Sequence, residues 1–140
     1  MAHTMITKIS HVGLAVENLD EVRQFFTDHF SLPSTAQENF GELLFSFIPF
    51  TGQNSRVELL QSTTPAGQIA KFISKRGPGI HHIALEVDDI QAELNRLKSR
   101  GLQLINEQPY RNAHNELVAF IHPKSTYGIL IELIEGQAHG

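Results

Sequence analysis

The sequence predicts an α+β fold built from two tandem copies of one strand–helix–strands module within a single domain. Two observations predict it. The segment His11-Val-Gly-Leu-Ala-Val returns as His82-Ile-Ala-Leu-Glu-Val, and Val57-Glu58-Leu59-Leu60 returns as Ile131-Glu132-Leu133-Ile134. Each copy takes up about half of the chain, which is far longer than a solenoid repeat, so a duplicated supersecondary unit is indicated.

The first copy begins with a strand over residues 6–16, where apolar and polar residues alternate. Asn18, followed three residues later by Glu21, forms a capping box that predicts a helix. The apolar residues that follow recur at helical spacing, at Leu19, Val22, Phe25, Phe26 and Phe30. After a polar loop through residues 37–39, strands are predicted over 43–50 and 56–61. The first module therefore spans about residues 6–62.

A connecting helix and the second copy complete the chain. Thr64-Pro65 and Gly77 delimit a helix over about 65–77, which links the modules. The second module spans about 79–135 of the single domain 1–140. Its predicted elements are a strand over 80–87, a helix from Asp89 to about Arg100 that Gly101 ends, and strands over 102–105, 117–121 and 129–134.

Composition narrows the class of protein. The chain has 140 residues, of which 41% are hydrophobic and 19% charged, as expected of a globular domain with a true core. Its net charge of −4 and its lack of a basic cluster argue against binding to nucleic acid. No apolar run approaches the length of a membrane span and the first residues do not resemble a signal peptide, so we expect a cytoplasmic protein with no membrane partner.

Each copy carries one His and one Glu inside an apolar strand-like run, which is typical of metal ligands. Because side chains in a strand alternate between its two faces, only one of His81 and His82 can face the same centre as His11, and the repeat selects His82. A buried, uncompensated carboxylate is costly, and a cation removes that cost. Since the chain has no Cys, two imidazoles and two carboxylates would hold a divalent cation: His11, Glu58, His82 and Glu132.

Several strings in the second half resemble a known family. They are Ile69-Ala-Lys-Phe-Ile-Ser-Lys-Arg-Gly leading into Gly79-Ile-His-His-Ile-Ala, Glu86-Val-Asp-Asp-Ile, and Phe120-Ile-His-Pro-Lys-Ser-Thr with Gly128-Ile-Leu-Ile-Glu-Leu. The two-module layout resembles the vicinal oxygen chelate (glyoxalase/bleomycin resistance/dioxygenase) superfamily, and the second half is most similar to its methylmalonyl-CoA epimerases. The resemblance covers nearly the whole chain and is most specific from residue 66 onward.

The resemblance implies paired βαβββ units that form one cup-shaped, mostly antiparallel sheet around a metal. It places the metal at the four residues that the repeat selects. The ion would be Co, Mn, Ni, Zn, Fe or Mg, because affinity alone does not name it. Glu42 is the candidate base before the 43–50 strand, although a gap at Gly41 would put Leu44 there instead. Glu132 is a candidate for the second catalytic group.

The implied reaction is epimerisation of methylmalonyl-CoA, or of a similar 2-substituted malonyl thioester, through a metal-stabilised enolate. One alternative is a lactoylglutathione lyase (glyoxalase I)-type isomerase. Another is a non-catalytic protein of the antibiotic-sequestering kind, which needs no metal. An iron dioxygenase is disfavoured, since such enzymes use two His and one carboxylate. The expected partner is an acyl-CoA, and the cup is compatible with a homodimer. The roles of His114 and Lys124 stay open.

Overall fold

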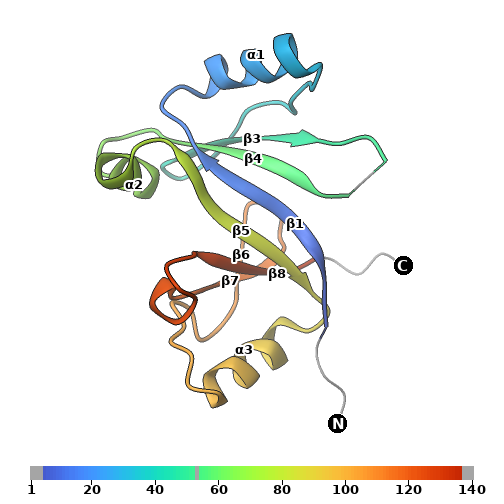
Figure 1. Ribbon diagram of the computed structural model, residues 1–140, viewed down its shortest axis with the longest axis vertical. Helices are drawn as coiled ribbons and strands as arrows, with labels where there is room; N and C mark the ends of the chain where they lie inside the picture. Colours follow the sequence, from blue (N-terminus) through green and yellow to red (C-terminus); the bar gives the residue numbers. More distant parts are fainter. Residues whose placement is uncertain (1–4, 53, 137–140) are drawn as a thin grey trace. The chain divides into compact units, whose positions relative to one another are not determined.

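The computed structural model of the chain describes residues 5–52 and 54–136, and Figure 1 labels most of its elements. In chain order they are β1 (Ile6–Ala15), α1 (Leu19–Phe30), β2 (Glu38–Phe40), β3 (Leu43–Pro49), β4 (Arg56–Ser62), α2 (Gln68–Arg76), β5 (Gly79–Val87), α3 (Ile90–Ser99), β6 (Tyr110–Arg111), β7 (Leu117–Ile121), the short 3-10 helix η1 (Pro123–Ser125) and β8 (Ile131–Glu135). Strand, helix and three strands occur twice, with α2 between the copies. The predicted α+β fold with two βαβββ modules is therefore confirmed.

The chain divides into two compact units, and one boundary between them falls within the sequence of β1. One unit is His11–His81, and the other contains residues 5–10 and 82–136 of the described chain. Hydrogen bonds order the strands β2-β3-β4-β1-β5-β8-β7-β6 in a mixed sheet. Within the units, β1 pairs parallel with β4 and β5 pairs parallel with β8, whereas the β2-β3-β4 and β6-β7-β8 pairings are antiparallel. The two copies thus have the same strand order.

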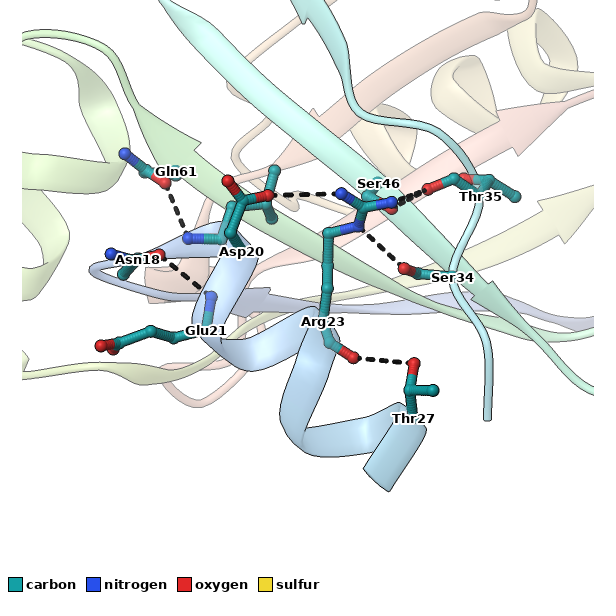
Figure 2. Close-up of polar contacts among 10 residues, drawn as sticks. Asn18, Asp20, Glu21, Arg23, Thr27, Ser34, Thr35, Ser46 and Gln61 are labelled. Atoms are coloured by element: carbon teal, nitrogen blue, oxygen red, sulfur yellow. Dashed lines mark hydrogen bonds and ion pairs between the residues drawn. The ribbon is translucent and has the colours of Figure 1, made fainter. Parts of the chain in front are cut away.

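Helix α1 begins where the capping signal predicts. The side chain of Asn18 accepts a hydrogen bond from the backbone N–H of Glu21 at 3.0 Å. Gln61 of β4 also reaches the helix start, because its side-chain oxygen accepts a bond from the Leu19 N–H at 2.8 Å. Figure 2 shows that Arg23 ties the helix to the following loop, donating to Ser34 Oγ at 2.8 Å and to the Thr35 carbonyl at 3.0 Å. Local capping and these longer contacts together hold α1.

In the His11–His81 unit, the two faces of the strands pack against different helices. On one face, Leu19 of α1 packs against Ile48 of β3 and Leu59 of β4, and all three are nearly inaccessible to solvent. On the other face, Ala15, Phe45, Leu60 and Ile69 form a second cluster, to which Phe72 and Ile73 of α2 add. Alternation along β3 and β4 separates the two sets, as expected when both faces of a sheet are partly covered.

The second unit has one large core, between α3 and one face of its strands. Ile90 and Leu94 of α3 pack against Val87, Ala119, Ile121 and Leu133. Ala84, Val118 and Ile134 form a smaller cluster on the opposite face of the strands. Helix α3 is capped by Asp89, whose side chain accepts a bond from the Ala92 N–H at 3.1 Å. Among the described residues, no helix is long and apolar enough to cross a membrane.

Three local predictions were wrong. Helix α2 begins at Gln68, whereas Thr64 and Pro65 lie in the bend and turn that precede it. The first turn of the helix is held at this position because the Ala70 N–H donates a hydrogen bond to Ser62 Oγ of β4. The stretch 102–105 is not a strand, since it makes one isolated bridge, from Leu104 to Ile121. The polar segment around Glu38, predicted as loop, instead forms the edge strand β2.

Candidate functional site

The first candidate pair lies in the His11–His81 unit. His11 of β1 and Glu58 of β4 approach with Nε2 and Oε1 3.2 Å apart, and only 5% and 13% of their side chains are exposed. Glu58 of β4 pairs with Gly13 of the parallel strand β1. His11 therefore lies on β1 two residues before the partner of Glu58. Phe47 of β3 pairs with Glu58. Its ring meets the His11 imidazole edge-on, with the two ring centroids 6.2 Å apart. The pair is therefore enclosed by an aromatic ring and by the sheet.

The second candidate pair lies in the other unit and repeats this arrangement. His82 Nε2 of β5 is 3.0 Å from Glu132 Oε1 of β8, with 4% and 8% of the side chains exposed. Ala84 pairs with Glu132, so the imidazole again precedes the opposite residue by two positions. Phe120 pairs with Glu132 from β7, and its ring meets the His82 imidazole edge-on at 5.8 Å.

The matching registers explain why each His meets its Glu. Residues two apart in a strand share a face, and directly paired residues of neighbouring strands lie on the same face. Gly13 and Ala84 are small, which leaves space beside each carboxylate for the ring two residues earlier. In both units this face is the one opposite the helix of that module, α1 or α3.

The donor atoms of each pair suit a divalent metal ion. Two ligand atoms that are each about 2.1 Å from one ion, at about 90° to each other, lie about 3.0 Å apart. The observed nitrogen–oxygen separations of 3.2 Å and 3.0 Å agree with this geometry. Imidazole and carboxylate are ligands that first-row divalent cations accept, and a cation would compensate two nearly buried carboxylates. Each pair therefore offers one nitrogen and one oxygen donor that suit a divalent metal ion.

Tyr110 lies on the same face as the second pair, and the sequence did not indicate this. It pairs with Val118 across β6 and β7, so its side chain leaves the sheet on the face that carries Phe120 and Glu132. Burial raises the pKa of the Tyr110 phenol above its usual value, and the charge of Glu132 raises it further. The phenol therefore remains a hydrogen-bond donor at neutral pH. No sequence signal identified it, because β6 has two residues and no alternation to read.

The predicted base Glu42 lies in the turn between β2 and β3 and is exposed. Its carbonyl accepts a hydrogen bond from the Thr63 N–H at 2.9 Å. The alternative position, Leu44, packs in the apolar cluster beneath α1. A further carboxylate, Glu38, pairs with Phe45 across β2 and β3, which places it on the face of Glu58. Because residues 37–39 were predicted as a loop, the sequence assigned no face to Glu38 and did not indicate it as a candidate base.

The other histidines and the candidate lysine are placed as follows. His81 faces away from His82 and meets the Phe72 ring edge-on at 4.9 Å, as expected of a packing residue. His114 lies in an exposed turn, where its N–H donates to Asn112 Oδ1 at 3.0 Å. Lys124 is an exposed residue of η1, and its N–H donates to His122 Nδ1 at 3.1 Å.

Another buried carboxylate lies outside both pairs. Glu93 of α3 has 2% of its side chain exposed, and its Oε1 lies 2.5 Å from Nη2 of Arg96, one helical turn away. The hydrogen bonds that Arg96 donates to this carboxylate raise the pKa of Arg96. Since α3 packs on the face opposite the His82–Glu132 pair, Glu93 serves the helix rather than the candidate site.

Comparisons with known proteins identify the family of the chain. The family model of the Glyoxalase/Bleomycin resistance protein/Dioxygenase superfamily matches residues 10–120. An ethylmalonyl-CoA/methylmalonyl-CoA epimerase of Cereibacter sphaeroides is 34% identical, over 92% of this chain and 98% of its own. The crystal structure of methylmalonyl-CoA epimerase from Mycobacterium tuberculosis is 34% identical with a TM-score of 0.90, covering 99% of this chain and 93% of that one.

A third relative was solved with a ligand. It is a Streptomyces coelicolor methylmalonyl-CoA epimerase variant in complex with 2-nitronate-propionyl-CoA. It is 25% identical to this chain with a TM-score of 0.89, and the alignment covers 96% of this chain and 97% of that one. The chain is thus similar in sequence and structure to acyl-CoA epimerases over nearly its full length.

Proposed function

Because the chain belongs to the glyoxalase/bleomycin resistance protein/dioxygenase superfamily, we propose that it is a metal-dependent epimerase of methylmalonyl-CoA or a similar 2-substituted malonyl thioester. The observation that carries the proposal is the buried His–Glu pair that occurs in both βαβββ units at the same strand register. Relatives named as methylmalonyl-CoA epimerases, at 34% identity, support the same reaction class.

We propose that His11, Glu58, His82 and Glu132 hold one divalent ion, each unit contributing one imidazole and one carboxylate. The donor set and the nitrogen–oxygen separation within each pair support this assignment. Cobalt, manganese, nickel, zinc, iron and magnesium all remain candidates, since geometry and availability select the metal. When bound, such an ion supplies Lewis-acid stabilisation of the negative charge that develops on the thioester oxygen as the substrate's C2 loses its proton.

The protein's own groups then have three tasks. Phe47 and Phe120 pack edge-on against imidazoles that are 5% and 4% exposed, and electrostatic interactions are stronger in such surroundings than in water. Epimerisation needs a proton removed from one face of C2 and returned to the other. We propose that Glu42 and Glu132 carry these two transfers. Tyr110, as a phenol on the face of Glu132, is available to donate a hydrogen bond there.

The reaction is tested by proton exchange at C2. The purified protein, loaded in turn with each candidate metal, is mixed with C2-deuterated methylmalonyl-CoA in ordinary water, and loss of deuterium is followed by mass spectrometry. We expect loss that depends on the metal. No loss with any metal, together with turnover of the glutathione hemithioacetal, would replace the epimerase by a glyoxalase I-type enzyme. Tight small-molecule binding by a protein that takes up no metal would indicate sequestration.

The base assignment is tested separately. Glu42→Gln removes a carboxylate from the turn before β3, and Glu38→Gln removes one from β2 on the face of Glu58. We expect Glu42→Gln to lower kcat for exchange, with metal content unchanged, and Glu38→Gln to serve as the neighbouring comparison. If Glu38→Gln lowers kcat and Glu42→Gln does not, the base is Glu38 and the assignment of Glu42 is wrong.

A further inference from the structure

The surroundings of the two His–Glu pairs differ in one charged residue. Two positions before Glu58, β4 carries Arg56, whereas the residue two positions before Glu132 is Leu130. Arg56 pairs directly with His11 across β1 and β4. Since residues two apart in a strand share a face, Arg56 leaves β4 on the same face as Glu58. One pair therefore has a guanidinium beside it and its counterpart has an apolar residue.

An aromatic ring holds this guanidinium in place. The Cζ atom of Arg56 lies 3.8 Å from the centroid of the Phe47 ring, which is the ring that meets His11 edge-on. A cation–π contact of this kind restrains the guanidinium and leaves its N–H groups available as hydrogen-bond donors. Phe47 thus connects Arg56 to the His11–Glu58 pair within one unit.

Arg56 has no protein anion to neutralise it in the described part of the chain. Its side chain is half-buried, and its contact there is the Phe47 ring rather than a carboxylate. By contrast, Arg23 and Arg96 each pair with a carboxylate one turn away in their helices. A guanidinium that a ring restrains, and that has no ion pair among the described residues, suits the binding of a carboxylate or phosphate through two parallel hydrogen bonds. Here it lies beside a candidate metal-binding pair.

We propose that Arg56 binds the anionic oxygens of the substrate and so determines its specificity for an anionic acyl thioester. This inference rests on the proposed epimerase function and names the residue that recognises the substrate's charge. A 2-carboxyacyl-CoA offers two sources of such oxygens. The acyl carboxylate keeps one oxygen free when the other engages an ion, and the CoA portion carries phosphates. Both sources present the same chemistry to a guanidinium.

The test compares Arg56→Gln and Arg56→Lys with the wild-type protein in the C2 exchange assay. We expect Arg56→Gln to raise KM at least tenfold with a smaller change in kcat and no change in metal content. Arg56→Lys keeps the positive charge but loses the planar guanidinium with its paired N–H donors, so its KM should lie between those of the wild type and Arg56→Gln. Arg76→Gln is the matched control, because it also removes an arginine near a phenylalanine, Phe72, with the same change in net charge. We expect its KM to equal that of the wild type.

A second substrate distinguishes the two sources of negative charge. The methylmalonyl thioester of N-acetylcysteamine keeps the acyl carboxylate and lacks every phosphate. A rise in KM for Arg56→Gln with both thioesters assigns the guanidinium to the carboxylate, and a rise with the CoA ester alone assigns it to a phosphate. A KM for Arg56→Gln equal to that of the wild type with both substrates overturns the proposal.

A direct binding measurement separates failure of this inference from failure of the proposed function. Wild type and Arg56→Gln, both loaded with metal, are titrated with methylmalonate and with inorganic phosphate by calorimetry. If the wild type catalyses no exchange but binds either anion more tightly than Arg56→Gln does, the anion site stands and the epimerase does not. Equal binding by the two proteins, or binding by neither, shows that Arg56 is not an anion site.

Discussion

His82 Nε2 and Glu132 Oε1 lie 3.0 Å apart, close to the 3.2 Å that separates His11 Nε2 from Glu58 Oε1. The same strand register produces both separations, since the residue two positions after each His pairs with the Glu. If each pair supplies two ligands of one ion, the two carboxylates should contribute similarly to metal binding.

We therefore predict that Glu58→Gln and Glu132→Gln each abolish stoichiometric metal uptake and lower the exchange rate by about a thousandfold, which corresponds to about 4 kcal/mol. Plasma emission spectrometry and the C2 exchange assay measure the two effects. Glu86→Gln is the control, because Glu86 is a carboxylate of β5 that pairs with Lys8 instead. Full metal occupancy in either variant would remove that carboxylate from the ligand set.

Tyr110 gives a prediction about pH. Its folded-state pKa is raised, above an ordinary value of about 10, first by burial and then by the charge of Glu132. Tyr110 therefore contributes stability that is fully present below about pH 10 and is lost as the pH rises through the folded-state pKa. We expect the free energy of unfolding to decrease in that range, and to decrease less in Tyr110→Phe.

The titration of Tyr110 can be observed directly. The chain has two tyrosines, so Tyr127→Phe leaves Tyr110 as its single phenol. Tyr127 is fully exposed, which makes this substitution mild. Ultraviolet absorbance of tyrosinate in this variant should show a midpoint above about 10. Tyr110 is 45% exposed in the structure, so a midpoint at or below that value would show that partial burial and the charge of Glu132 do not raise its pKa.

Gly67, the N-cap of α2, has no room for a side chain. A Cβ atom there would lie 2.4 Å from Ser62 Oγ and 2.8 Å from Ser62 Cβ, and Ser62 Oγ binds the Ala70 N–H. We predict that Gly67→Ala lowers the free energy of unfolding by about 1–3 kcal/mol, measured by urea denaturation. Gly136→Ala is the control, since its added Cβ makes ordinary contacts at 3.6 Å or more. Equal stability of the two variants would show that α2 can shift freely.

Arg23 anchors α1 by side-chain hydrogen bonds to two residues of the following loop, Ser34 and Thr35. We predict that Arg23→Met lowers the free energy of unfolding by about 1–3 kcal/mol, because two charged hydrogen bonds are lost, one of them to a partly buried hydroxyl. Lys71→Met, which removes one positive charge from the exposed surface of α2, should change it little. Since Arg23 lies on the α1 side of the sheet, metal content should be unchanged in both proteins.

Where the sequence patterns were strong, they predicted local structure well. Asn18 and Asp89 cap the two module helices. The repeat alone indicated the His and the Glu of each pair, which the structure brings within 3.2 Å and 3.0 Å of each other. Where the segments were short, the patterns failed. The β2 segment at Glu38 has three residues and a polar start, so nothing in it alternates, while the apolar 102–105 stretch alternates but makes a single bridge.

The sequence by itself determined the duplicated βαβββ plan and the types of ligand, because periodicity and repeated motifs are local properties of the chain. The tertiary structure decided which residues surround each pair. Phe47 faces the first pair through the register of β3 on β4, and Arg56 lies beside His11 through the long-range pairing of β1 with β4. Tyr110 shares the face of Glu132 through the registers of β6, β7 and β8. Strand register is set by hydrogen bonds and packing between these strands, and a shift by one residue would turn each of these side chains to the opposite face.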